Sequence, residues 1–243
     1  MSSPPRLVWW VALASVGVGM TVWLPARSLS VFLPASVSCD FLTGTVWHGG
    51  CENFSVRGSR SGDLAWTVEP MDFDGVAVPL RFLWQRENSH LQGTLRGIRK
   101  RELVLEDIEG EVSLQTLRDS LPADMTLGPL AAVAGRLRFF DLDLALDAQG
   151  ELRAGGTVEL RDTVRLRDRA LLGDFRASFG DAASKKPRGE LQGVSGPLGV
   201  DGIVEFSAGR RYAVTLRLAP RDVTAARALG VLTATEVSAE GNF

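Results

Sequence analysis

Short runs in which apolar and polar residues alternate, separated by glycines, make up most of the chain after residue 27. In "VPLRFLWQ", at residues 78–85, the alternation puts Val78, Leu80, Phe82 and Trp84 on one face of an extended segment. This period of two predicts antiparallel strands with one buried face. Similar runs occupy residues 64–68, 158–166, 175–179 and 212–218. The chain is therefore predicted to be mostly β.

The two halves of the chain carry strand and glycine signals in a similar order. "GTVW" at residue 44 is followed twenty residues later by "LAWTVEP", and "GRLRF" at residue 135 is followed at the same distance by "GGTVELR". Helical patterns are limited to "LQTLRDSL" and residues 222–229. We expect an all-β fold with few short helices. It is built either as two similar antiparallel β lobes, residues 28–130 and 131–243, or as one long curled β sheet.

The segment "RLRFFDLDLALD", at residues 136–147, changes its apolar face between Phe139 and Phe140. Such a change predicts a β-bulge. Asp141, Asp143 and Asp147 alternate with leucines, so these acids line the exposed face of a strand. A calcium loop would need turn geometry and a bidentate glutamate instead.

A run of eighteen uncharged residues, Leu7–Leu24, precedes the strands. At about 1.5 Å per helical residue it spans roughly 27 Å, enough for the hydrocarbon core of a bilayer. Trp9, Trp10 and Trp23 sit near its two ends, where indole rings favour the membrane interface. A cleavable signal peptide would have a shorter apolar region and a small-x-small cleavage site. We therefore predict an uncleaved single-pass anchor over residues 7–24.

The anchor sets the expected location of the folded part. Residues 1–6 form a short polar tail that is expected in the cytoplasm, and the bulk of the chain lies on the periplasmic side of the inner membrane. Cys39 and Cys51 then face an oxidising compartment, in which a disulfide is a possible link between them. A simple hairpin with that bridge would turn at Thr43–Thr45.

The residues needed for chemistry are scarce. Charge is nearly balanced, with 27 basic and 29 acidic residues, which disfavours a nucleic-acid partner. The nearest acid to His48 is Glu52, beyond two glycines, and His48 and His90 lack a clear third metal ligand. The glycine-rich segments do not match a phosphate-binding loop. We predict no catalytic residues, metal, cofactor or small-molecule substrate, and hence a binding or assembly protein rather than an enzyme.

Aromatic and basic residues mark positions of expected structural or interface importance. In "LTGTVWHGG", Gly44–Trp47 is interpreted as a strand and His48–Gly50 as its turn, with Trp47 packing on or capping the sheet. Trp66 and Trp84 fall on the apolar side of predicted strands. The basic turn "RGIRKR" carries Arg99, Lys100 and Arg101, which suit anionic headgroups or a protein partner.

The order of these segments along the chain is similar to that of a known family. The anchor, "LTGTVWHG", "LAWTVEP", "LGPLAAVAGRLRFFDLDLAL" and "VSAEGNF" together resemble protein N of the type II secretion system, the general secretion pathway N family. The resemblance implies a bitopic inner-membrane protein whose periplasmic part assists export of folded proteins across the outer membrane. It also implies other secretion-system subunits as partners, and it carries no catalytic residues.

A second function belongs to another class. Envelope proteins of the AsmA-like type also combine an N-terminal anchor with long curled β sheets, and they handle lipid in a groove. A lipid groove should be lined continuously by apolar side chains, including Val78, Leu80, Phe82 and Trp84. A component of a secretion machine should have closed lobes, with its apolar residues buried against each other.

Overall fold

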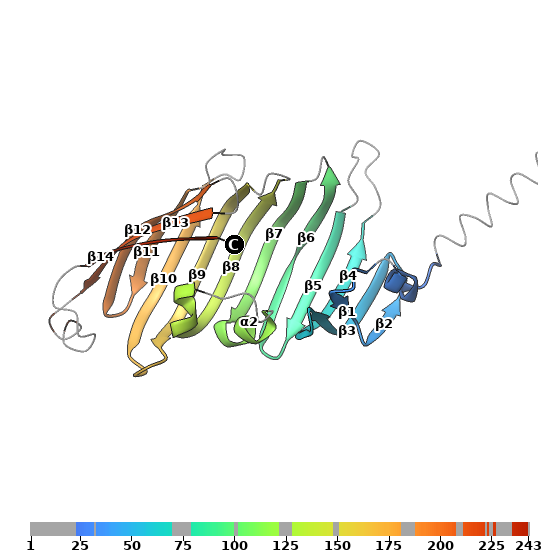
Figure 1. Cartoon of the computed structure of the whole chain (residues 1–243), viewed down its shortest axis with the longest axis horizontal. Coiled ribbons are helices and arrows are strands. Elements are labelled where there is room, and N and C mark those ends of the chain that lie inside the picture. Colours follow the sequence, from blue (N-terminus) through green and yellow to red (C-terminus); the bar gives the residue numbers. More distant parts are fainter. Residues whose placement is uncertain are drawn as a thin grey trace, which may run out of the picture.

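The described part of the chain forms one antiparallel sheet of fourteen strands with short helices at its margins (Figure 1). The computed structural model describes residues 23–31, 33–69, 79–99, 102–121, 128–147, 151–180, 188–207, 211–221, 223, 226 and 235–242. The strands are β1 (Val37–Ser38), β2 (Phe41–Gly44), β3 (His48–Val56), β4 (Ser59–Val68), β5 (Pro79–Arg86), β6 (Ser89–Arg99), β7 (Glu102–Ser113), β8 (Val133–Leu146), β9 (Leu152–Arg165), β10 (Leu171–Phe179), β11 (Arg188–Ser195), β12 (Leu198–Ser207), β13 (Arg211–Pro220) and β14 (Thr235–Asn242). The helices include η1 (Ala26–Val31), α2 (Leu114–Ser120) and η2 (Gly128–Ala132).

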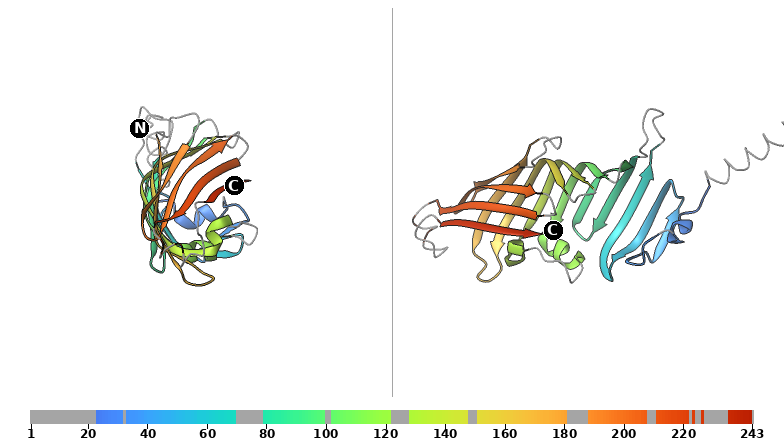
Figure 2. Two further views of the ribbon diagram at one scale, coloured as in Figure 1. Left: turned by 90° about the vertical axis from the view of Figure 1, so that its left-hand side faces the viewer. Right: turned by 45° about the horizontal axis from the view of Figure 1, so that its top comes forward.

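The strands follow one another in a simple meander. Each strand from β3 onward pairs with the next one along the chain, and β1 and β2 both pair with β3. Pairing of β7 with β8 carries the sheet without a break past the expected lobe boundary at residues 130 and 131. Of the two predicted architectures, the single long curled sheet is the one that forms. Viewed along its long axis, the sheet curves around η1 and α2, which lie on its concave side (Figure 2).

The pairing register places the apolar residues of successive strands on one side of the sheet, which we call the apolar face. Trp66 of β4 lies opposite Phe82 of β5, and Leu80 of β5 lies opposite Leu95 of β6. The same face continues through the pairs Leu105–Leu144, Val158–Ala177, Ala177–Leu191, Val204–Val214 and Leu216–Val237. The alternation seen in the sequence therefore becomes one apolar surface that crosses the sheet.

A buried cluster closes the N-terminal end of the apolar face. It consists of Ala26 from η1, Cys51 from β3 and Trp66 from β4. Cys51 is joined to Cys39 by a disulfide, with the two Cα atoms 5.7 Å apart. The indole N–H of Trp66 donates to the carbonyl oxygen of Val46 at 2.9 Å. Because η1 packs on this face and lies on the concave side, the apolar face is the concave one.

The hairpin that contains "LTGTVWHGG" reverses earlier than the sequence predicts. β2 ends at Gly44 and β3 begins at His48, so the assignment of Gly44–Trp47 as strand and His48–Gly50 as turn is wrong. Gly44 has a φ of 79°, a conformation that suits glycine, and the Thr45 N–H donates to the His48 carbonyl at 2.8 Å. Gly49 stays in the strand because the Trp66 ring lies directly against it, leaving no room for a side chain.

Three bulges are stabilised by the same hydrogen-bond arrangement. Asn53, Asp107 and Asp162 have positive φ angles, and an aspartate on the following strand accepts the backbone N–H of each. The acceptors are Asp63, Asp143 and Asp174, at 2.9, 3.0 and 2.8 Å respectively. A bulge removes one residue from the backbone ladder, so a carboxylate replaces the missing carbonyl partner. The bulge predicted near Phe140 is also present, since the register of β8 against β9 shifts between Phe140 and Asp143.

The predicted helix at "LQTLRDSL" is confirmed as α2. Ser113 is its N-cap, because the Ser113 side chain accepts the N–H of Thr116 at 2.9 Å. The Ser113 N–H in turn donates to the hydroxyl of buried Ser89 at 3.1 Å. Leu114 is fully buried, so the helix is fixed to the sheet from its first residue. The helix predicted over residues 222–229 lies largely outside the described residues.

The described residues contain no helix that is both long and apolar enough to cross a membrane. The anchor predicted over residues 7–24 lies outside them as far as residue 22, and so do Leu7, Trp9 and Trp10.

Replacing both Cys39 and Cys51 with serine should lower the free energy of unfolding by about 3 kcal/mol, the value that loop entropy gives for a closed loop of this size. Urea denaturation of the full-length protein in detergent, followed by tryptophan fluorescence, measures the loss. Non-reducing peptide mapping of protein from the periplasmic side provides the control, since two free thiols would contradict the bridge.

Candidate functional site

His48 lies on the polar side of the sheet, opposite the apolar face. Its Nδ1 atom is 2.9 Å from the hydroxyl of Thr67, its cross-strand neighbour on β4. Both side chains line a hollow of about 520 Å³ that also includes Arg81, Glu109 and Asp141. In the described part of the chain, no group of three histidine, cysteine or acidic side chains is arranged to hold a metal ion. The contact joins exposed His48 to half-buried Thr67 on the adjacent strand, and we assign it no catalytic role.

Two of the three acids predicted along β8 and at its end accept backbone N–H groups. Asp143 accepts the N–H of the bulge residue Asp107, and Asp147 accepts the N–H of Glu151 at 2.8 Å. Asp141 is itself a bulge residue, with a φ of 46°, and its side chain is exposed. Leu142, its neighbour, is buried, which agrees with the predicted alternation of acids and leucines.

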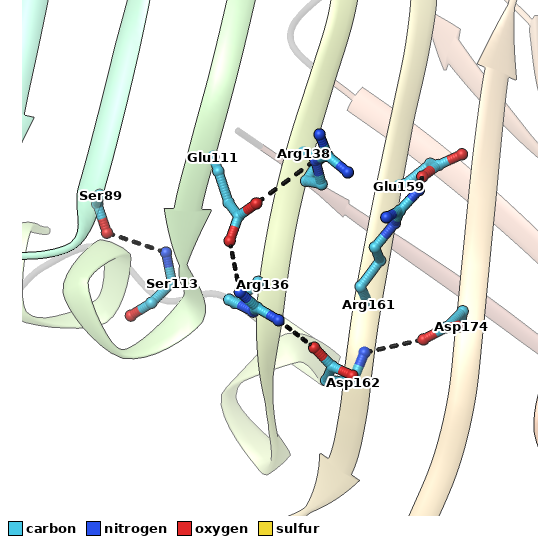
Figure 3. Close-up of polar contacts among 9 residues, drawn as sticks. All are labelled: Ser89, Glu111, Ser113, Arg136, Arg138, Glu159, Arg161, Asp162 and Asp174. Carbon is cyan, nitrogen blue, oxygen red and sulfur yellow. Dashed lines mark hydrogen bonds and ion pairs between the residues drawn. The ribbon is translucent and has the colours of Figure 1, made fainter.

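A network of arginines and acids crosses the convex face from β7 to β10 (Figure 3). Arg136 contacts Glu111 at 2.9 Å and also pairs with Asp162, so it links β7, β8 and β9. Glu159 of β9 receives hydrogen bonds from Arg161 and from Arg176 of β10. Positive and negative charges alternate within the network, so it ties strands together without making a surface of one sign. We call these residues the charge network.

Glu159 is the most enclosed member of the charge network, with 9% of its side chain exposed. Burial alone would raise the pKa of Glu159, but hydrogen bonds from Arg176 and Arg161 outweigh burial and hold the pKa below its ordinary value of 4.5. The pKa of Asp174 is lowered as well, chiefly because the Ser195 hydroxyl donates to it at 2.7 Å. Sequence reasoning missed this network, although every second residue is charged in "RLR" at residues 136–138 and in "ELR" at residues 159–161.

The apolar face is only half-buried over much of its area. Phe82, Trp84, Leu91, Val158, Ala177 and Leu191 keep part of their surface open, and a dense buried cluster occurs at the N-terminal end. Val78, the first of the predicted lining residues, lies outside the described residues. The other three, Leu80, Phe82 and Trp84, lie together on the apolar face. The sheet therefore presents apolar side chains continuously rather than enclosing them in two lobes.

The remaining predicted positions lie at the N-terminal end of the sheet, on β5 and at one long side. Trp23, Leu24 and Trp47 are exposed at the N-terminal end. Trp84 is held inside the sheet, because its indole N–H donates to the Ser61 carbonyl at 2.6 Å. Arg99 is the last residue of β6, while Lys100 and Arg101 lie outside the described residues.

The family model for type II secretion system protein N matches residues 35–236. The chain belongs to this family. A search of curated proteins and a search of solved structures each find no match. The resemblance found in the sequence is therefore confirmed, and the protein is a component of the type II secretion system.

Replacing Glu159 with glutamine should lower the free energy of unfolding by about 1.5 kcal/mol at pH 7, because two charged hydrogen bonds are weakened. A carboxylate with a lowered pKa stabilises the fold above its unfolded pKa, and this contribution disappears as the pH falls through the folded value. The difference between wild type and Glu159→Gln should therefore shrink below pH 4.5. Urea titrations at several pH values measure it, with Glu190→Gln, an exposed acid on β11, as the control.

Proposed function

We propose that this protein is an accessory subunit of the type II secretion system that assists export of folded proteins across the outer membrane by binding other subunits. Residues 7–24 hold it in the inner membrane, with residues 1–6 in the cytoplasm and the sheet in the periplasm. Family membership supports this role, and the sequence offers only two histidines and two cysteines for chemistry. The protein acts by binding, without catalysis.

The observation that carries the binding proposal is the open edge at β14. On one side β14 pairs with β13, from Thr235–Leu218 to Asn242–Arg211, and among the described strands none lies on its other side. The side chains of Thr235, Glu236, Val237 and Ser238 are all exposed. An unpaired strand edge offers N–H and C=O groups that a strand of another chain can bind. The edge at β1 and β2 is different, because η1 and the disulfide pack beside it.

The basic turn after Arg99 and the acids Asp141 and Asp143 are further proposed contact points. Arg99 ends β6 at one long side of the sheet, whereas the two acids lie on β8. A partner that binds the β14 edge and reaches along the convex face would meet charges of both signs.

Replacing Val237 with lysine should weaken binding at the β14 edge by about tenfold or more, because lysine on an edge strand opposes addition of another strand. Secretion by a deletion strain carrying the variant, together with recovery of secretion subunits after in-cell crosslinking, measures the effect. Val194→Lys is the matched control, since Val194 is also exposed but lies on the interior strand β11. Equal secretion by both variants would refute the edge proposal.

A second candidate function is lipid binding on the apolar face, as in the AsmA-like envelope proteins. The observation that favours it is the half-buried apolar face, on which Leu80, Phe82 and Trp84, three of the four predicted lining residues, lie together. An acyl chain laid on this face would cover apolar surface that the described part of the chain leaves open. Phospholipid is the ligand class that this surface suits.

Ala177→Glu should remove bound lipid, because the new carboxylate would lie on the apolar face between Val158 and Leu191. Ser178→Glu adds the same group one residue later on the opposite, exposed face and should leave lipid binding unchanged. Native mass spectrometry of the full-length proteins in detergent measures bound phospholipid, and circular dichroism verifies the fold. Wild-type protein free of lipid would eliminate this second function and leave the first.

A further inference from the structure

Exposed large apolar side chains concentrate in one short part of the chain. Six of the thirteen such residues found in the described part fall between residues 23 and 47: Trp23, Leu24, Val31, Leu33, Phe41 and Trp47. The other seven are spread over residues 83–237. We call the six the N-terminal apolar surface. Large exposed apolar patches on a folded protein usually mark a protein or membrane contact.

Contacts within the fold keep these six residues at one end of the sheet. The carbonyl of Leu24 accepts the N–H of Val46 at 3.0 Å, and Pro25 forms a β-bridge with Thr45. The segment at Trp23 and Leu24 therefore runs beside the β2–β3 turn that carries Trp47. η1, which ends at Val31, packs against the same end of the sheet, and β2 begins at Phe41 (Figure 1).

We propose that the N-terminal apolar surface docks on the lipid bilayer, so that the folded part contacts the membrane in addition to its anchor. This inference rests on the membrane anchor of the proposed function. The apolar run Leu7–Leu24 and the N-terminal apolar surface share Trp23 and Leu24, so no linker separates them. A chain leaving the hydrocarbon core at Leu24 therefore enters η1 after a single residue, Pro25.

The thickness of the headgroup region favours contact between the N-terminal apolar surface and the bilayer. The headgroup region on each side is roughly 5–8 Å thick. The hydrogen bond between Val46 and Leu24 holds the adjacent Trp47 within that layer, where tryptophan is favoured. Val31 and Phe41 are 82% and 63% exposed, and each gains by leaving water for the acyl boundary. Exposed Arg27 lies between Trp23 and Val31 in sequence and suits lipid phosphate.

Docking at this end orients the whole sheet. Strands in a sheet lie about 4.8 Å apart, so the steps from β3 to β14 place the far edge roughly 53 Å from β3, measured along the sheet. The apolar face begins at the membrane, and the open β14 edge stands away from it. A partner would therefore bind the β14 edge in the periplasm, away from the membrane surface.

Photo-crosslinking of the full-length protein tests the contact. The amino acid p-benzoylphenylalanine replaces Val31 or Phe41 in protein reconstituted into vesicles of phosphatidylethanolamine and phosphatidylglycerol. Leu171 and Val194, which are 55% and 50% exposed on β10 and β11, are the matched control positions. Peptide mass spectrometry after irradiation should find phospholipid adducts at residues 31 and 41 with at least tenfold higher yield than at residues 171 and 194.

Three results would overturn the proposal. Equal lipid yields at all four positions would mean nonspecific contact, and protein adducts at residues 31 and 41 in cells would mean that a subunit covers the surface. Absence of lipid adducts at those two positions would leave the end of the sheet free of the bilayer. If lipid adducts are absent, alkaline extraction of the same samples shows which proposal fails. Protein that stays in the membrane still has its anchor, so only docking is refuted. Protein released from the membrane has no anchor, so the anchor and docking are both refuted.

Discussion

A single layer of backbone hydrogen bonds organises the described part of this molecule. A sheet with one apolar face ordinarily buries that face against a second layer of secondary structure. Here η1 and α2 cover part of the concave side, and the described strands all belong to one sheet. Curvature is the remaining means of sheltering the apolar residues, since it turns them toward one another. The half-buried state of Phe82 or Leu191 follows from this arrangement.

Curvature requires local departures from regular pleating, and the chain supplies them in two ways. Bulges at Asn53, Asp107 and Asp162 bend individual strands and increase their twist. On the concave side, where side chains converge, large rings lie against glycines of the neighbouring strand, as Phe179 does against Gly189. A side chain at such a glycine would clash with the ring. The curvature of the sheet therefore depends on glycine at these positions, because the rings can lie directly on the backbone there.

Sequence patterns predicted much of this fold: alternations of period two indicated several strands, among them β4, β5, β8, β9, β10 and β13, and their apolar side, and a separate helical pattern indicated the helix at residues 114–120. They failed at the β2–β3 hairpin, because a glycine can serve either a turn or close packing. Gly44 takes the first role and Gly49 the second, and only the ring of Trp66, seventeen residues later in the sequence, distinguishes them. The charge network was missed for a related reason. Its partners, such as Arg136 and Asp162, become neighbours only through the registers of the β7–β8 and β8–β9 pairs.

A single layer also has no second sheet to compensate for a weak point in the ladder. Each strand contacts mainly its neighbours, so a force applied at β14 reaches β3 only through every intervening pair, as in repeat proteins. The bulges are the places where that path loses backbone hydrogen bonds. Near Asn53 the covalent link of Cys51 lies two residues away. Asp162 itself pairs with Arg136 of the charge network, and Glu106, next to Asp107, pairs with Arg96 of β6. Side-chain bonds therefore reinforce the sheet where curvature has weakened its backbone, which allows it to be both bent and continuous from its N-terminal end to the open edge at β14.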